Sequence, residues 1–240
     1  KTILIIGANS DIAKEIAKIY VNKNYNIYLF SRNKSLLQSF ENRLFIKPNI
    51  EILESNKENN ENFSLILNNL IHKPDTVIIA NGFMGDNKNF SITKLREIFE
   101  INFFDVIQYS EICIEYFKKN KIEGNLAVFC SVSAIRGRAK NFFYGSAKSA
   151  LLNYLSGLRQ KNSKNKISIT SIILGFVDTK MLRDSSENYN NFLIANPKRI
   201  AKKVVVSIDK KKDFYYPIIW RIIMFIIKLI PEKIFKKFNF

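Results

Sequence analysis

The fold is decided at the start of the chain, by Thr2-Ile3-Leu4-Ile5-Ile6-Gly7-Ala8-Asn9-Ser10-Asp11-Ile12-Ala13. The uncharged run that ends at Gly7 predicts a buried strand. A stretch with the apolar spacing of an amphipathic helix follows it, with Ile12, Ile16, Ala17 and Ile19 on one face. A strand that turns tightly into a helix predicts the first unit of an α/β domain.

The same alternation continues along the chain. Further strands are predicted at Asn26–Phe30, Ile50–Leu53, Thr76–Ala80, Leu126–Phe129, Ile167–Leu174 and Phe214–Ile218, and long helices at Lys94–Lys118 and Tyr144–Gln160. Strands that are apolar throughout are typical of a parallel sheet whose two faces are both covered by helices. We therefore predict a Rossmann-type, doubly wound parallel sheet in one α/β domain over residues 1–217, with an apolar and basic extension over residues 218–240. Two segments without periodicity, Ser55–Asn62 and Asp178–Asn196, are expected to be irregular.

Composition excludes several other classes of protein. The net charge is +17, but Lys and Arg are spread along the chain and form no recognition motif, so we expect no nucleic-acid partner. Cys113 and Cys130 fit neither a zinc site nor a disulfide framework, which predicts buried thiols and no metal. Because Lys1 leads directly into the first strand, we expect no signal peptide in this sequence and a cytoplasmic location.

The turn after the first strand is a predicted phosphate site. A tight strand-to-helix turn aims backbone N–H groups and the positive end of the helix at a pyrophosphate. We assign the cofactor contacts there to Gly7, Asn9, Ser10, Asp11 and Ile12. An ordinary turn capped by Ser10 or Asp11 remains an alternative, because only one of the three glycines usual in such turns is present.

The end of the second strand carries information on the type of dinucleotide. Ser31-Arg32-Asn33 contains no carboxylate for a ribose 2′-hydroxyl, and the Arg32 guanidinium suits a 2′-phosphate. The sequence thus predicts that Ser31 and Arg32 contact the cofactor and that NADP(H) is favoured over NAD(H). The alternative is that Arg32 is an ordinary solvated surface residue.

A tyrosine and a lysine four residues apart begin the second long helix, in Tyr144-Gly145-Ser146-Ala147-Lys148. Residues at this spacing share a helix face. A phenol has a pKa of about 10, and a neighbouring cation is expected to lower it toward a useful range. The pair alone is a common coincidence.

Other polar residues strengthen the interpretation of Tyr144 and Lys148 as an acid–base pair. Ser131 follows the fifth strand by two residues, at the sheet edge where ligands of open α/β folds bind. Asn102 interrupts an apolar helical stretch, so its amide needs a backbone bond or a structural water. Gly175-Phe176-Val177-Asp178-Thr179 supplies a turn that closes over one end of a cofactor.

With these residues the chain resembles the short-chain dehydrogenase/reductase family from Ile3 to about Pro217. The resemblance rests on Gly7, Ala80-Asn81-Gly82, Asn102, Ser131, the Tyr144/Lys148 pair and Gly175–Thr179. It implies a carbonyl reductase or alcohol dehydrogenase in which Tyr144 protonates the carbonyl oxygen as a hydride arrives from the nicotinamide. It also implies that Lys148 lowers the Tyr144 pKa and holds the ribose, that Ser131 binds the substrate oxygen, and that Asn102 fixes a water. Cofactor contacts are implied for Asn81, Gly82, Tyr144, Lys148, Gly175, Val177 and Thr179.

The family resemblance also implies a homodimer or homotetramer formed through the two long helices. A non-catalytic dinucleotide-binding sensor or scaffold is the alternative, although it would not need a phenol beside an ammonium. Three departures from the family pattern stand out: Asp11 and Ala13 replace glycines, Leu174 replaces proline, and no Asp follows the third strand. The glycine turn and the tail are similar to the branch of decaprenylphosphoryl-2-keto-ribose reductases and related bacterial envelope-sugar reductases.

The C-terminal extension has its own character. Its apolar run from Ile218 to Ile230 is shorter than the roughly 20 residues that span a bilayer, and from Lys198 onward twelve Lys and Arg face three acids, a net charge of +9. Trp220 and the flanking basic residues are typical of an interfacial helix. We expect residues 218–238 to contact the inner membrane face and a lipid-linked carbonyl substrate, with a helix packed on the core, a subunit interface or a lid as alternatives.

Overall fold

The computed structural model describes residues 1–42, 50–56, 61–85, 89–185 and 191–238. Seven parallel strands form one sheet in the order β3-β2-β1-β4-β5-β6-β7. They are β1 (Thr2–Ile6), β2 (Asn26–Ser31), β3 (Ile50–Glu54), β4 (Thr76–Ile79), β5 (Asn125–Ser131), β6 (Ser168–Leu174) and β7 (Phe214–Tyr215). The order reverses between β1 and β4, so the chain is doubly wound, as predicted.

Strand β1 shows why both faces of this sheet are apolar. Successive side chains of a strand point to opposite faces. Leu4 and Ile6 pack in one hydrophobic cluster, whereas Ile3 and Ile5 pack in the other. The five strand residues are all buried, which accounts for the continuous apolar run in the sequence.

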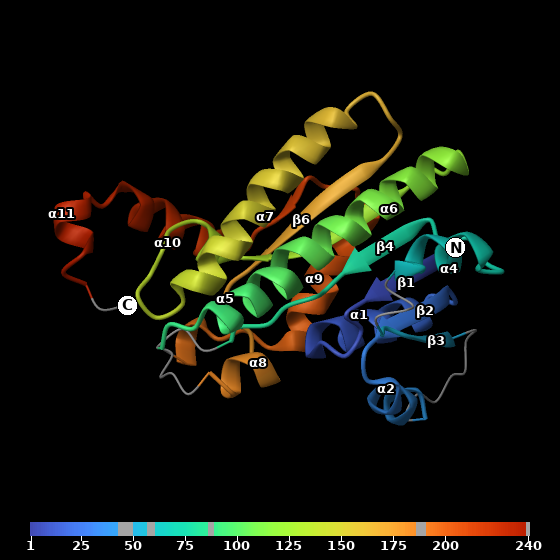
Figure 1. The fold of residues 1–240 in the computed structure, drawn as a ribbon, viewed down its shortest axis with the longest axis horizontal. Helices are drawn as coiled ribbons and strands as arrows, with labels where there is room; N and C mark the ends of the chain where they lie inside the picture. Colours follow the sequence, from blue (N-terminus) through green and yellow to red (C-terminus); the bar gives the residue numbers. More distant parts are fainter. Residues whose placement is uncertain (43–49, 57–60, 86–88, 186–190, 239–240) are drawn as a thin grey trace.

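The helices cover the two faces (Figure 1). They are α1 (Asp11–Val21), α2 (Lys34–Glu41), α4 (Phe63–Asn69), α5 (Ile92–Phe99), α6 (Asp105–Lys119), α7 (Phe142–Lys161), α8 (Lys180–Arg183), α9 (Pro197–Asp209), α10 (Ile218–Leu229) and α11 (Glu232–Phe235). Helices α1, α2 and α9 supply buried residues to one cluster, and α4, α6, α7 and α10 to the other. The long helices α6 and α7 lie side by side, joined by a hydrogen bond from Tyr154 Oη to Glu111 Oε1 of 2.9 Å.

Several predicted boundaries are wrong. The last strand stops at Tyr215, because Pro217 fixes its own backbone and serves as the N-cap of α10. The predicted helix Lys94–Lys118 is divided by a π-helical turn, Glu100–Phe104. Within Asp178–Asn196 the described residues form α8 and a short 3₁₀ turn at Asn191–Leu193, and residues 186–190 lie outside the described part. Of Ser55–Asn62, residues 57–60 lie outside it.

The tail is a packed element, and the expected interfacial role of Trp220 is wrong. Trp220 is 5% exposed and Met224 is fully buried, both within the main core cluster. A Cβ on Gly175 would lie 1.8 Å from Trp220 Nε1, so only glycine leaves room for the indole. The Trp220 ring meets Phe176 edge-on, with 4.9 Å between ring centres. No helix among the described residues is long and apolar enough to cross a membrane.

Candidate active site

One large cleft opens at the carboxyl edge of the sheet, where β1, β4, β5 and β6 end. Its volume is about 570 Å³, and its lining combines polar side chains with apolar walls. It brings together all but one of the residues predicted to be functional, namely Gly7, Asn9, Ser10, Asp11, Ile12, Ser31, Arg32, Asn81, Gly82, Ser131, Tyr144, Lys148, Gly175, Val177 and Thr179. The exception is Asn102.

Tyr144 sits near the start of α7 and is buried against the wall of this cleft. Burial raises the pKa of its phenol to about 12, because the phenolate would lose hydration. A hydrogen bond with the Ser131 hydroxyl and the Arg138 guanidinium act in the opposite direction but are smaller effects. The phenol is therefore protonated at neutral pH and shares a hydrogen bond with Ser131.

Lys148 lies one turn further along α7 and is 2% exposed. Its ammonium donates hydrogen bonds to the carbonyl oxygens of Asn81 and Phe129, each at 3.2 Å. The Nζ atom lies 5.9 Å from the centre of the Tyr144 ring. Burial lowers the pKa of Lys148 to about 8, so its charge is lost within the ordinary pH range.

The expected lowering of the Tyr144 pKa by Lys148 is not found. Both groups are removed from water, and desolvation disfavours the charged form of each. The Lys148 ammonium moreover donates its hydrogen bonds to the carbonyl oxygens of Asn81 and Phe129. Desolvation therefore determines the Tyr144 pKa, and the spacing of four residues from Lys148 does not lower it.

Asn102 lies outside the cleft and is fully buried in the π-helical turn. Its amide nitrogen donates to the carbonyl oxygens of Phe83 and Ile98, both at 2.7 Å, and its Oδ1 accepts from the Phe83 N–H at 3.1 Å. Of the two explanations given for this polar residue, the structure shows the backbone bond. Asn102 fixes the segment after β4 that carries Gly82.

The turn between β1 and α1 begins at Gly7, whose φ is 74°. A Cβ there would come within 2.7 Å of Asn81 Oδ1, so glycine is required by both the backbone conformation and the neighbouring turn. Asn9 then ties this turn to the end of β2. Its Nδ2 donates to Ser31 Oγ at 2.6 Å and to the Asn33 carbonyl at 2.9 Å.

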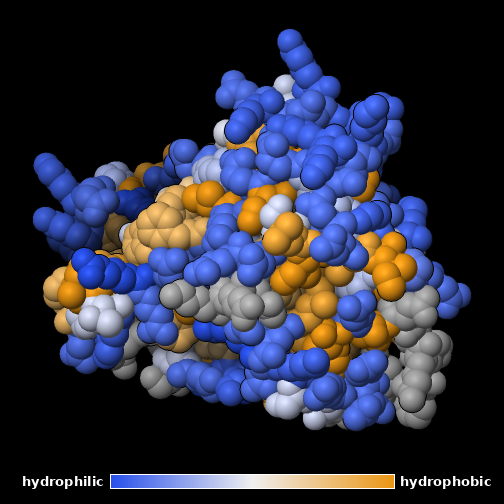
Figure 2. Space-filling view, turned by 45° about the vertical axis from the view of Figure 1, so that its right-hand side comes forward, coloured by the Kyte–Doolittle hydropathy of each residue, from blue (hydrophilic) through white to orange (hydrophobic). Residues whose placement is uncertain are grey.

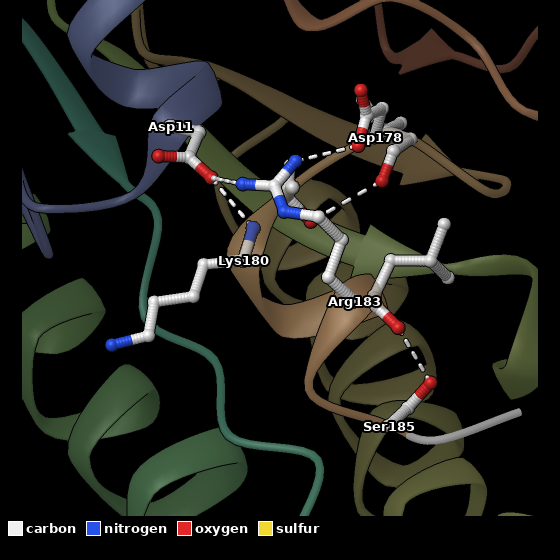
Figure 3. Close-up of polar contacts among 8 residues, drawn as sticks. Asp11, Asp178, Lys180, Arg183 and Ser185 are labelled. Carbon is white, nitrogen blue, oxygen red and sulfur yellow. Dashed lines mark hydrogen bonds and ion pairs between the residues drawn. The ribbon is translucent and has the colours of Figure 1, made fainter.

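Asp11 faces the other side of the turn (Figure 3). Ser10 is the N-cap of α1 but makes no side-chain capping bond, and Asp11 does not cap α1 either. Asp11 Oδ2 accepts the backbone N–H of Lys180 at 2.7 Å and lies 3.9 Å from Arg183 Nη2. Arg183 also pairs with Asp178 at 2.5 Å. The carboxylate is thereby compensated by α8, which accounts for an acid beside a site suited to phosphates.

The family model for short chain dehydrogenases matches residues 1–190. The chain belongs to the short chain dehydrogenase family. It is thus an NAD(P)-dependent oxidoreductase of the class that acts on CH–OH groups and carbonyls.

Individual relatives of this family are distant in sequence. The chain is 28% identical to 11-beta-hydroxysteroid dehydrogenase B of Sesamum indicum over 76% of its own length, and it spans about half (52%) of that protein. It is 22% identical to a benzil reductase ((S)-benzoin forming) of Saccharomyces cerevisiae, covering 78% of this chain and 75% of that one. A short-chain dehydrogenase from Sphingobium yanoikuyae in complex with NADPH has a similar fold, with a TM-score of 0.80 at 17% identity over 89% of this chain and 86% of that one.

Sequence reasoning missed several residues of the short chain dehydrogenase cleft. Ser55, directly after β3, occupies the place where no Asp was found, and its hydroxyl is hydrogen-bonded with Tyr109. Lys14, Ser133, Asn141 and Met181 also line the cleft. The position of Ser55 after a predicted strand offered a signal, and Lys14, Ser133 and Asn141 lie within three residues of predicted site residues.

The two cysteines are buried and free, as expected. Burial raises the pKa of both thiols, which makes them poor nucleophiles. Among the described residues no group of three or more His, Cys, Asp or Glu side chains could hold a metal ion.

Proposed function

We propose that the chain is an NADPH-dependent carbonyl reductase with Tyr144 as the proton donor. The observation that carries this proposal is a protonated phenol beside a serine hydroxyl, both lining the cleft at the sheet's carboxyl edge. A pKa of about 12 keeps Tyr144 in the acid form that reduction requires. Ser131 is positioned by its neighbours as well, since its Oγ accepts the Ser133 N–H at 3.1 Å.

The residues of the cleft fit a nicotinamide dinucleotide. The glycine turn at Gly7 and the start of α1 would hold the pyrophosphate, with Asn9 and Ser31 shaping the path to the adenosine end. Lys148, Asn81 and the Gly175–Thr179 turn would hold the nicotinamide end. When bound, the dinucleotide supplies the hydride, which adds to the carbonyl carbon while the Tyr144 proton adds to the oxygen. Lys148 would hold the nicotinamide ribose, and Asn102 would act by fixing the Gly82–Phe83 backbone.

Preference for NADPH rests on Arg32. Its exposed side chain lines the cleft where β2 ends. The Arg32 charge also acts on the Asp105 carboxyl. Burial raises the pKa of Asp105, and Arg32 partly offsets this rise. A guanidinium here suits a 2′-phosphate. The NADPH bound to the Sphingobium yanoikuyae protein, which shares the fold, supports the same assignment.

For the substrate we infer a carbonyl carried on a lipid, such as a polyprenyl-phosphate keto-sugar. The support is the apolar and basic pair α10–α11, of which α10 packs through Trp220 on the turn that forms one wall of the cleft. On this proposal the protein is cytoplasmic, sits at the inner membrane face, and forms a homodimer or homotetramer through α6 and α7.

The test is NADPH oxidation with a panel of carbonyl compounds that includes soluble ketones and lipid-linked keto-sugars. We expect turnover that Tyr144→Phe lowers by about 10²-fold or more, while the variant still binds NADPH. A Phe variant with the activity of the wild type would refute the role of Tyr144. Binding of NADPH without turnover of any compound would favour the sensor or scaffold.

A further inference from the structure

Helix α10 has apolar residues on its exposed side as well as on its buried side, with Arg221 and Lys228 as its only charged residues. Trp220, Ile223, Met224 and Ile227 recur at helical spacing and pack against the core. The opposite side consists of six apolar residues that are each 43% to 68% exposed: Ile218, Ile219, Ile222, Phe225, Ile226 and Leu229. A surface helix of a water-soluble domain usually places polar residues there. This exposed apolar face needs a partner.

The apolar face continues onto α11 and is surrounded by positive charge. Ile234 in α11 and Phe238 shortly after it are further apolar residues of the tail, both about half exposed. The five basic residues from Pro217 onward are Arg221, Lys228, Lys233, Lys236 and Lys237, against one acid, Glu232. Glu232 is itself neutralised by Arg136 at 2.8 Å. The charge that remains around the face is therefore positive.

Besides the core packing of α10, the Arg136 side chain ties the end of α10 and α11 to the body of the protein. Arg136 Nη1 donates to the carbonyl oxygens of Ile227 and Ile230, both at 2.6 Å, where α10 ends. Its guanidinium also stacks on the Phe235 ring at 3.8 Å. The face is thus presented by a fixed element, which lies at one end of the molecule in Figure 1. Figure 2 shows orange side chains interleaved with blue ones toward that end.

We propose that the exposed face of α10–α11 docks on the surface of an anionic lipid bilayer. An interfacial helix buries its apolar side about 5–10 Å into the headgroup boundary, and nearby basic residues add attraction of about 1 kcal/mol each. A second copy of the chain is a poorer occupant, because symmetric pairing would bring two positive surfaces together with no free acid on either tail. The helix is too short to cross the bilayer, so it lies on the surface.

Docking would also place the cleft near the bilayer. Trp220 of α10 packs on Gly175 and Phe176, which line the cleft, and Arg136 follows Ser131 by five residues. This consequence rests on the proposed function and suits a carbonyl compound held at the membrane. The lipid contact itself does not depend on that function.

The test is co-sedimentation of the full chain with vesicles of phosphatidylcholine alone or mixed with phosphatidylglycerol. We expect binding only to the anionic vesicles at low salt, with loss at 1 M salt, where the Debye length falls from about 10 Å to about 3 Å. Ile222→Gln with Phe225→Gln should weaken this binding at least about tenfold. Both positions are exposed, so NADPH binding should remain unchanged.

The matched control replaces two exposed apolar residues outside α10 and α11. Leu65 in α4 and Ile71 just after it are exposed, and Leu65→Gln with Ile71→Gln should bind vesicles like the wild type. Equal binding by both double variants would refute the proposal, as would a wild type that stays in solution with anionic vesicles. A wild-type oligomer that the tail variant alone dissociates, without vesicle binding, would assign the face to a second copy instead. If the wild type binds anionic vesicles but oxidises NADPH with none of the carbonyl compounds, only the proposed function is refuted.

Discussion

Lys148 is the one charged side chain among the buried residues of the described structure, and its protonation governs the site. Burial lowers its pKa to about 8, so the ammonium predominates below pH 8 and is lost above it. Tyr144 stays protonated over this range because its own pKa is about 12. We therefore expect kcat/KM for carbonyl reduction to be level below pH 8 and to fall as pH rises through it. Lys148→Met should reduce the rate and abolish this limb, and a limb that survives in the variant would belong to another group.

Arg32 decides the cofactor at the scale of one side chain. Removing its guanidinium with Arg32→Ala takes a charge-assisted hydrogen-bonding group from a 2′-phosphate, a loss of about 1.5–3 kcal/mol. We expect NADPH affinity to drop by one to two orders of magnitude and NADH affinity to stay the same, as measured by fluorescence titration. Arg32→Lys keeps the charge and should give an intermediate loss. Equal losses of NADPH and NADH would show that Arg32 does not contact the 2′ position.

At the scale of elements, the packing of α10 on the end of β6 depends on Gly175. The Cβ added by Gly175→Ala would collide with Trp220, and overpacking of this kind costs about 1–3 kcal/mol or more of unfolding free energy. Denaturant unfolding measures the cost. Trp220→Leu in the same chain should recover part of it, so that the two changes cost less together than their sum.

The control for this prediction is Gly157→Ala in α7, where the new methyl group meets no atom within 4 Å. A helical glycine is less stable than alanine by about 0.5–1 kcal/mol, so this variant should be slightly more stable than the wild type. If Gly175→Ala is as harmless as Gly157→Ala, α10 does not pack on Gly175 as described.

At the scale of the whole molecule, the tail belongs to the hydrophobic core. Cutting the chain after Pro217 removes Trp220 and Met224 from the main cluster, and burying one large apolar side chain contributes about 1.5–3 kcal/mol. We expect the truncated protein to lose at least about 3 kcal/mol of unfolding free energy, measured in urea. Ile222→Gln with Phe225→Gln changes only exposed residues and should leave this free energy nearly unchanged. A truncated chain as stable as the full one would show that the tail contributes nothing to the core.

Trp220 reports directly on the state of the tail, because it is the only tryptophan of the chain. In the intact protein its emission should be that of a buried indole and should stay so on anionic vesicles, since docking uses the opposite side of α10. A red shift on binding would mean that α10 leaves the core.

The sequence by itself determined the sheet, the glycine turn and part of the cleft lining, including Ser131, Tyr144 and Lys148. These features are local: a run such as Thr2–Ile6 is apolar because both its faces are buried, and the residues after successive parallel strands must meet at one edge of the sheet. The i, i+4 spacing of Tyr144 and Lys148 is likewise set by one helix.

Only the tertiary structure decided the electrostatics and the contacts between distant segments. The pKa values of Tyr144 and Lys148 follow from how much water the whole fold excludes, which the spacing of four residues does not specify. The compensation of Asp11 by Arg183 joins residues 172 positions apart in the sequence. Trp220, which by its neighbours resembles an interfacial anchor, is buried because Gly175 leaves it a place on the core. The sequence marks α10 as apolar, but which side faces the core and which side is left exposed is settled by packing against β6.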